Sequence, residues 1–175
     1  MTNPLRPAEI ARLRGAPLTY SCIGGTATGQ IDDGYESFTR SIPVRRLSFD
    51  QVVERLMTWQ IHERAGLRVS AQSTQVVENE VVLMRLGLGA AALRIPCRVV
   101  HVIREHDRVG FAYGTLHGHP ESGEEQFLIE RRCEQVRFTV HAFSRPASAL
   151  ATLSGPIGRQ FQSIMTTRYL RAAEA

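Results

Sequence analysis

The sequence predicts a single α+β domain in which an antiparallel sheet of six to seven strands packs on a long C-terminal helix. Apolar residues recur at three- and four-residue spacing over 48–66, strand-like runs follow one another over 67–145, and helical spacing returns over 146–173. A chain of 175 residues is long enough to bury one core and short for two. We therefore assign residues 17–175 to one domain and residues 1–16 to an N-terminal arm.

The composition is that of an ordinary globular protein. Hydrophobic residues make up 43% of the chain and charged residues 22%, which argues against disorder. No window approaches about 18 consecutive apolar residues, and the N-terminus lacks the apolar stretch of a signal peptide, so we expect no membrane partner and a cytoplasmic location. The cysteines Cys22, Cys97 and Cys133 show no CxxC spacing. They fit reduced thiols and indicate no zinc site.

The basic charge comes from arginine alone. The formal net charge is +4, and all 21 basic side chains are Arg. A chain without lysine cannot form a Schiff base or supply the lysine of a phosphate-binding loop. Arg45–Arg46 and Arg131–Arg132 are isolated pairs, and no run of five basic residues occurs. We therefore expect no nucleic-acid partner, and no motif predicts a cofactor or a bound metal.

The first third of the chain contains three expected elements before its main helix. Pro7 opens a short helix that runs through Arg14. Residues 18–23 form an apolar run of strand type, which leads into a glycine-rich turn. Residues 36–44 form a second extended segment.

The main helix and the strands that follow it are predicted by a change in hydrophobic period. Ser48 is a plausible N-cap, and Gly66 ends the helix. Turn residues then separate six strand-like runs. These runs are 67–73, 80–88, 95–104, 109–117, 125–131 and 135–144. The last run alternates most clearly, with Val136, Phe138, Val140 and Ala142 on one face.

The C-terminal segment is predicted to be a long helix that lies on the sheet. Its apolar stripe includes Met165 and Tyr169, and Gln162 and Thr166 fall on the opposite side. Pro156 removes a backbone donor, so we expect a kink or a fresh start near Ser154.

This element order resembles the helix-grip fold of the START-like (SRPBCC) superfamily, in which a curved sheet wraps the last helix around a cavity. The segments LTYSCIGGTATG, IPCRVVHVIREHDRVGFAYGTLHGHPESGEEQF and AFSRP, with SGPIGRQFQ and RYL, resemble signature segments of uncharacterised protein family 0548, found in bacteria and plants. The resemblance covers nearly the whole chain, and residues 110–127 are its most distinctive part. It implies a helix-grip fold with an internal cavity and transfers no catalytic residue to this chain.

The segment from Gly110 to Phe127 is the first place to look for a site. If it begins as a strand, Tyr113 and His117 share one face, and the opposite face carries small residues such as Gly114. A bare face of this kind is explained either by close packing of the C-terminal helix or by room for a ligand.

Histidines and carboxylates in this segment allow two kinds of chemistry. His117 and His119 lie two residues apart near Glu121, Glu124 and Glu125, a spacing compatible with a metal site but also with hydrogen-bonded turn histidines. A proton-transfer role for His117 or Tyr113 beside a buried Glu125 is the other hypothesis, because burial would move their pKa values towards neutrality.

The segment GGTATG has glycines spaced like those of a phosphate-binding loop. Gln30 and Ile31 stand where such a loop has lysine and Ser/Thr, and we expect no helix to begin there. A flexible turn that tolerates positive φ and rims the cavity is the resulting interpretation.

Two arginines and two aromatic residues complete the candidate ligand-binding set. Arg98, within a half-buried strand, and Arg145, at a strand end, are either cavity cations or partners in structural ion pairs. Trp59 and Phe161 are interpreted as core and cavity wall.

The sequence therefore predicts a cavity that binds a small apolar or amphipathic molecule. Candidate ligand-binding residues are Tyr113, His117, Arg98, Arg145, Trp59 and Phe161. The alternative is an enzyme that uses the same cavity for acid–base chemistry such as cyclisation, dehydration or hydrolysis, with His117, Tyr113 and Glu125 as candidate catalytic residues. A third hypothesis is a protein-interaction module that uses the outer face of the sheet.

Overall fold

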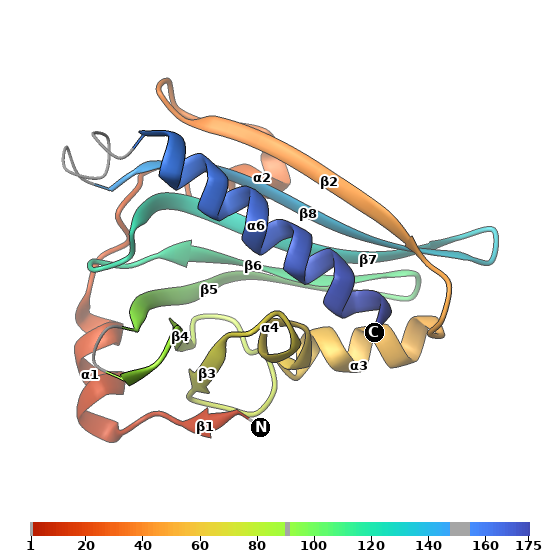
Figure 1. The fold of residues 1–175 in the computed structure, drawn as a ribbon, viewed down its shortest axis with the longest axis horizontal. Helices are drawn as coiled ribbons and strands as arrows, with labels where there is room; N and C mark the ends of the chain where they lie inside the picture. Colours follow the sequence, from red (N-terminus) through yellow and green to blue (C-terminus); the bar gives the residue numbers. More distant parts are fainter. Residues whose placement is uncertain (1, 90–91, 148–154) are drawn as a thin grey trace.

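The structure is a computed structural model that describes residues 2–89, 92–147 and 155–175, with side chains of the last helix from residue 162 onwards. Within these residues one curved eight-stranded sheet has the order β1-β3-β4-β5-β6-β7-β8-β2 (Figure 1). All neighbouring strands are antiparallel except β1 and β3. The sheet is thus larger than the six to seven strands expected.

Each of the six expected strand runs corresponds to one of the strands from β3 to β8. The strands are β1 (Asn3–Pro4), β2 (Glu36–Val44), β3 (Arg68–Ala71), β4 (Val81–Leu86), β5 (Leu93–Glu105), β6 (Arg108–Thr115), β7 (Glu121–Arg132) and β8 (Gln135–Pro146). The alternation predicted for β8 is present, because Val136, Phe138, Val140 and Ala142 are buried and Arg137 is exposed. The additional strands are β1, in the arm, and β2, which pairs with β8 at the far edge.

Three helices cover the concave face of the sheet. They are α3 (Phe49–Met57), α4 (Gln60–Arg64) and α6 (Gly155–Glu174). Figure 1 shows α6 crossing the sheet over β6, β7 and β8, with α4 and α3 beside its C-terminal end. Pro156 is the second residue of α6, where its missing N–H costs no helical hydrogen bond, whereas Ser154 lies outside the described residues. None of the described helices is long and apolar enough to span a bilayer.

The helix expected over 48–66 is divided in two by Trp59. Ser48 caps α3 as predicted, in a reciprocal capping box with Gln51. Trp59 then adopts φ 65°, a left-handed conformation that a bulky residue rarely takes, and α4 begins at the next residue. This break turns the indole inward, where it is 2% exposed and packs edge-on against Phe111 at 5.2 Å between ring centroids.

The convex face is covered by the N-terminal part of the chain. In α1 (Pro7–Gly15), Leu13 is fully buried against Leu83 and Leu116 of the sheet side. The following residues do not form the strand expected over 18–23. Leu18 makes an isolated bridge to Leu116, and a one-turn helix, α2 (Gly25–Thr28), follows.

The small residues of β6 therefore have a different partner from the one expected. A Cβ on Gly114 would lie 2.3 Å from the Tyr20 hydroxyl, so the glycine admits the N-terminal segment rather than the C-terminal helix. Helix α6 packs instead on the face that carries Phe127, whose ring lies 5.1 Å from that of Tyr169.

His62 of α4 lies at the centre of the concave core. Its ring is surrounded by the rings of Trp59, Phe111, Tyr113, Phe127 and Tyr169, at 4.7 to 6.0 Å between centroids. The side chain is fully buried, and neither ring nitrogen has a hydrogen-bond partner in the described part of the chain. Burial lowers the pKa of His62 to about 3, so the imidazole is neutral in the folded protein.

We expect His62 to make the protein less stable in acid. The pKa of His62 in the folded state lies below its unfolded value near 6.5, so the unfolded chain takes up the proton first as pH falls. Between pH 7 and pH 5 this one group should remove about 2 kcal/mol of unfolding free energy. In His62→Phe that loss should be absent from urea unfolding curves measured at both pH values. His117→Phe is the matched control, because His117 is exposed and its removal should leave the acid loss unchanged. An equal acid loss in wild type and His62→Phe would contradict this assignment.

Candidate functional site

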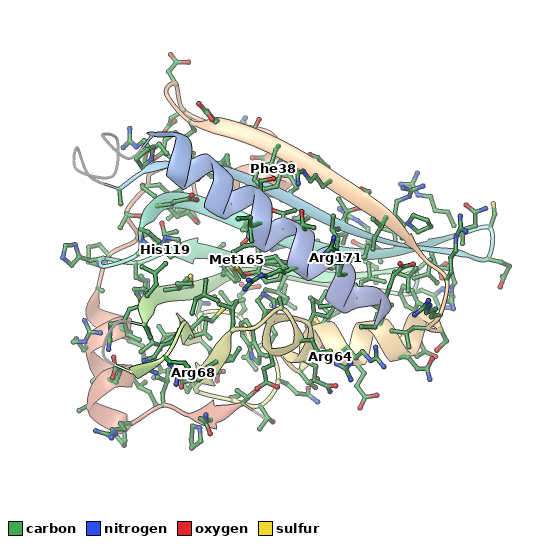
Figure 2. The ribbon with its side chains drawn as sticks, viewed as in Figure 1. Phe38, Arg64, Arg68, His119, Met165 and Arg171 are labelled. Carbon is green, nitrogen blue, oxygen red and sulfur yellow. The ribbon has the colours of Figure 1, made fainter. Side chains whose placement is uncertain are left out.

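A cavity of about 60 Å³ lies between the sheet and α6, where β6 turns into β7 and β8 ends. Figure 2 shows His119 at this end of the sheet and Met165 on α6. Apolar and polar groups share the wall. The lining residues are Ile95, Tyr113, Thr115, His119, Pro120, Glu121, Gly123, Glu124, Glu125, Ala142, Phe143, Ser144, Gln162, Met165 and Tyr169. Since a cavity needs roughly 10–15 Å³ to hold one water molecule, this cavity is larger than a single-water site.

A tyrosine and a carboxyl group face each other on neighbouring strands inside this cavity. Tyr113 and Glu125 are directly opposite in the β6–β7 register, so their side chains share one face. The Tyr113 hydroxyl donates a hydrogen bond of 2.7 Å to Glu125 Oε2. The hydroxyl of Tyr169, from α6, interacts in turn with that of Tyr113. The sheet and the helix thus contribute to one chain of polar groups.

The environment of Glu125 brings its protonation change close to neutral pH. Burial raises the pKa of Glu125 to about 7, against the lowering effect of the Tyr113 hydrogen bond, and the charge of Glu121 raises it further. Burial and the charge of Glu125 raise the pKa of both Tyr113 and Tyr169 well above 10, so both phenols keep their protons. Glu125 can therefore both accept and donate a proton near pH 7.

The turn from β6 to β7 adds a neutral imidazole and a second carboxyl group. His119 Nδ1 accepts a 2.9 Å hydrogen bond from the backbone N–H of Glu121. Burial lowers the pKa of His119 to about 4, and burial also raises the pKa of Glu121, against the lowering effect of a hydrogen bond from Ser144. Gln162 Nε2 donates to Ser144 Oγ at 3.0 Å, which ties α6 to β8 across the cavity.

Of the predicted site residues, the structure brings Tyr113 and Glu125 together and places His117 elsewhere. Strand β6 ends at Thr115, so the two-residue alternation stops before His117, which is exposed on the turn and does not line the cavity. No group of three His, Cys, Asp or Glu side chains that could hold a metal occurs among the described residues. The structure therefore places His117 outside this cavity, unlike Tyr113 and Glu125.

The other predicted ligand-binding residues also lie away from the cavity. Arg98 is on the convex side, where its Nη2 donates to the carbonyl oxygens of Arg14 at 2.8 Å and Ala16 at 2.7 Å at the end of α1. This arrangement is a helix cap rather than an ion pair or a cavity cation. The guanidinium of Arg145 lies 4.6 Å from the ring centre of Tyr35. Trp59 belongs to the core, and the side chain of Phe161 lies outside the described residues.

The segment GGTATG has the positive φ angles that were predicted, 81° at Gly24 and 74° at Gly29, but these two glycines flank a one-turn helix where no helix was expected. Helix α2 begins at Gly25, and the backbone N–H groups of Gly24 and Thr26 donate to the Glu124 carboxylate at 2.8 and 3.1 Å. The hydroxyls of Tyr20, at 2.7 Å, and Thr26 complete four hydrogen bonds to this carboxylate. The glycines thus hold a carboxylate of the same chain, about 100 residues away, rather than a phosphate.

Sequence reasoning missed Gln162 and Thr166 as inward-facing residues of α6. Gln162 lines the cavity, and Thr166, 1% exposed, donates its hydroxyl proton to the Gln162 carbonyl oxygen. That internal hydrogen bond lets a polar residue occupy the buried face. Any Ser or Thr inside a helix is able to bond in this way to the carbonyl oxygen four residues earlier. The sequence prediction should therefore not have assigned Thr166 to the exposed face on its polarity alone.

Residues 19–172 match the family described as "Domain of unknown function (DUF1990)". The UPF0548 protein of Deinococcus radiodurans is 44% identical over 174 residues, which are 90% of this chain and 88% of that protein. The chain belongs to this family. The resemblance to protein family 0548 expected from the sequence is thereby confirmed.

Solved structures show that this DUF1990 fold is shared by distant proteins. A hypothetical protein from Helicobacter pylori has a TM-score of 0.60 and 14% identity, over 90% of this chain and 99% of that one. The ginseng major latex-like protein 151 from Panax ginseng has 0.54 and 13%, over 80% and 95%. The di-domain ARO/CYC StfQ from the steffimycin biosynthetic pathway also has 0.54 and 13%, over 80% of this chain and 49% of that one. These likenesses establish the fold.

We expect Glu125→Gln to stabilise this DUF1990 domain at neutral and higher pH. Because burial raises the pKa of Glu125 above its unfolded value near 4.5, its favourable contribution is complete below pH 4.5 and is lost as pH rises through 7. Gln resembles the protonated carboxyl group, so the variant should gain about 1 to 3 kcal/mol over wild type between pH 4.5 and pH 8.

Urea unfolding at pH 4.5, 6 and 8 tests this expectation. Glu130→Gln is the matched control, because Glu130 lies on the same strand outside the cavity, beside Arg108 and Arg132. It should show no gain that grows with pH. If Glu125→Gln is equally destabilised at all three pH values, the carboxyl group is not held in the environment described.

Proposed function

We propose that the protein binds a small apolar or amphipathic molecule in the cavity between its sheet and α6. The observation that carries this proposal is the hollow itself, whose wall combines apolar side chains such as Ile95, Ala142 and Met165 with the hydrogen-bonded pair Tyr113–Glu125. Ligand sites in proteins have this composition, with a mostly apolar wall and a few placed polar groups. The cytoplasmic location expected from the sequence is part of the proposal, and the free state of Cys22, Cys97 and Cys133 supports it.

The fold supports this proposal. One neighbour of the same fold is named as an ARO/CYC protein of a biosynthetic pathway. Because this chain is only 13% identical to that protein, we carry over no residue role, and the support for binding comes from the cavity of this chain.

A second candidate function is acid–base catalysis in the same cavity. Glu125 favours it, because its pKa of about 7 lets it take a proton from one position of a bound molecule and return it to another. In the structure the Tyr113 hydroxyl donates its one proton to Glu125 at 2.7 Å; once Glu125 has itself taken up a proton, Tyr113 is free to donate to an oxygen that gains negative charge. Glu125 and Tyr113 thus take the roles in which His117 had also been considered.

The third hypothesis, recognition of a protein by the outer sheet face, has less support. The chain's own N-terminal part covers the convex side of β4 to β7 through α1, Leu18, Tyr20 and α2. The patch that such a partner would contact is therefore already occupied along these strands.

Filling the cavity should remove the bound molecule without unfolding the protein. Ala142 is 2% exposed and lines the cavity, so Ala142→Leu places three more carbon atoms in existing space. Native mass spectrometry of protein purified from its host should show a small molecule on wild type and none on Ala142→Leu. The melting temperature should change by no more than about 5 °C, because overpacking is avoided.

Ala27→Leu provides the control for this experiment. Ala27 is exposed, so the same substitution there should leave the bound molecule in place. A molecule that stays bound to Ala142→Leu would show that the cavity is not its site.

Glu125→Gln separates a binding protein from an enzyme. In an acid–base enzyme the wild type should carry product and the variant the unconverted molecule. The two extracted molecules should then differ in chromatographic retention and NMR spectrum, and also in mass if the reaction is a dehydration or a hydrolysis. In a binding protein, any molecule that Glu125→Gln retains should be identical to the wild-type one by all three measurements, and Glu130→Gln should carry the wild-type molecule in either case.

A further inference from the structure

We propose that the molecule bound in the cavity carries a basic nitrogen, held as a cation beside the Glu125 carboxylate and the neighbouring tyrosine hydroxyls. This inference rests on the proposed function, because it names the chemical class of ligand for the same cavity. It specifies that the polar end of the amphipathic ligand carries a positive charge.

The first observation is that Glu125 has an open hydrogen-bonding position. Its Oε2 accepts from Tyr113, whereas in the part of the chain that the structure describes its Oε1 accepts no hydrogen bond. The adjacent Glu124 shows what a structural carboxylate requires here, since it accepts four hydrogen bonds from Tyr20, Gly24 and Thr26. A carboxylate removed from water without such partners is costly, so Glu125 is suited to a partner that comes from outside.

The second observation is the charge of the cavity wall. Glu121 and Glu125 both line it, and His119 is neutral there because burial lowers its pKa to about 4. Among the described lining residues none carries a positive charge. The two arginines that the sequence suggested as cavity cations are held elsewhere, at the end of α1 and over Tyr35. The charges of these described residues would therefore repel an anionic ligand, whereas a cation would be attracted to both carboxylates.

The third observation concerns the groups that surround Glu125. Tyr113 and Tyr169 line the cavity beside it, and their hydroxyl oxygens are able to accept hydrogen bonds from an ammonium group. Ile95, Ala142 and Met165 supply apolar surface for the carbon substituents of an amine. This combination of a carboxylate, tyrosine hydroxyls and apolar side chains is complementary to an alkylammonium ion.

The volume of the cavity limits what is enclosed. About 60 Å³ corresponds to roughly four to six water-sized groups, enough for an ammonium group and its first carbon atoms. The remainder of a longer ligand would extend towards the mouth of the cavity.

Ligands that differ only in the charge of one end test the proposal. We would measure the binding of propylamine, propan-1-ol and propionate, and of hexylamine, hexan-1-ol and hexanoate, to the full chain at pH 8 by isothermal titration calorimetry. At least one amine should bind about tenfold or more tightly than its alcohol, and neither carboxylate should bind. Tighter binding of an alcohol or a carboxylate than of the matching amine would overturn the proposal and leave the binding function in place.

The pH dependence gives a second, independent readout. Alkylamines stay protonated up to about pH 10, so the changing group is Glu125, and amine affinity should rise about tenfold from pH 6 to pH 8 as its carboxyl group ionises. Glu121 and His119 are the other titratable side chains on the cavity wall beside the tyrosines and Glu124. Glu125→Gln should remove both the rise and the preference for amine, whereas Glu130→Gln should keep both.

Two further outcomes distinguish a failure of the cation proposal alone from a failure of the binding function. If Glu125→Gln stays folded, by circular dichroism, and still prefers the amine, Glu125 is not the group that selects the ligand and the proposal fails. If none of the six compounds binds and host-purified protein carries no small molecule, the binding function itself fails, and the inference with it.

Discussion

The hydrogen bonds available to two adjacent glutamates of β7 determine how the rest of the structure is arranged. Glu124 and Glu125 lie on opposite faces of the sheet, and the two faces provide their carboxyl groups with different numbers of hydrogen-bond donors. On the convex side, Glu124 accepts four hydrogen bonds from Tyr20 and the start of α2. That arrangement compensates the loss of hydration and ties the N-terminal segment to the sheet. On the concave side, Glu125 receives one hydroxyl group, and burial moves its pKa to about 7. Because successive side chains of a strand point to opposite faces, the consecutive residues Glu124 and Glu125 differ in role. Glu124 anchors the N-terminal segment, and Glu125 is available to a bound molecule.

The packing of α6 determines that Glu125 lies in a hollow rather than in water. The ring of Tyr169 contacts His62 and Phe127, and its hydroxyl reaches Tyr113, so the helix is held by an aromatic core next to the polar groups. Gln162, about two helical turns before Tyr169, donates a hydrogen bond to Ser144. Between these two contacts the cavity remains, because Ala142 offers little side chain to fill it. The aromatic core and the cavity are therefore consecutive parts of one interface between helix and sheet.

Hydrophobic period predicted most of the strands and α3, because a half-buried element must repeat its apolar residues at its own spacing. It placed Tyr113 and Glu125 on strands that prove to be paired, so their meeting could be anticipated. The same period could not say which face of β6 receives the C-terminal helix, since alternation is symmetric until the partner of each face is known. That choice depended on Gly114, which admits Tyr20 on the convex side. For the same reason the sequence could not show that Arg98 lies on the convex face. It also could not show that β6 ends at Thr115, two residues before His117. The pairing of GGTATG with Glu124 involves residues about 100 positions apart and leaves no local pattern.

The position of β2 has a consequence for the order in which the molecule assembles. Residues 36–44 are made early, yet within the sheet they pair with β8, which begins at Gln135. Every hydrogen bond of that ladder joins residues roughly 90 to 110 positions apart, and contacts of such long separation form slowly. During synthesis on the ribosome, β2 has no strand to pair with until most of the chain has emerged. The sheet edge at β2 is thus completed late, and until then the nascent protein exposes an unpaired strand that chaperones can recognise.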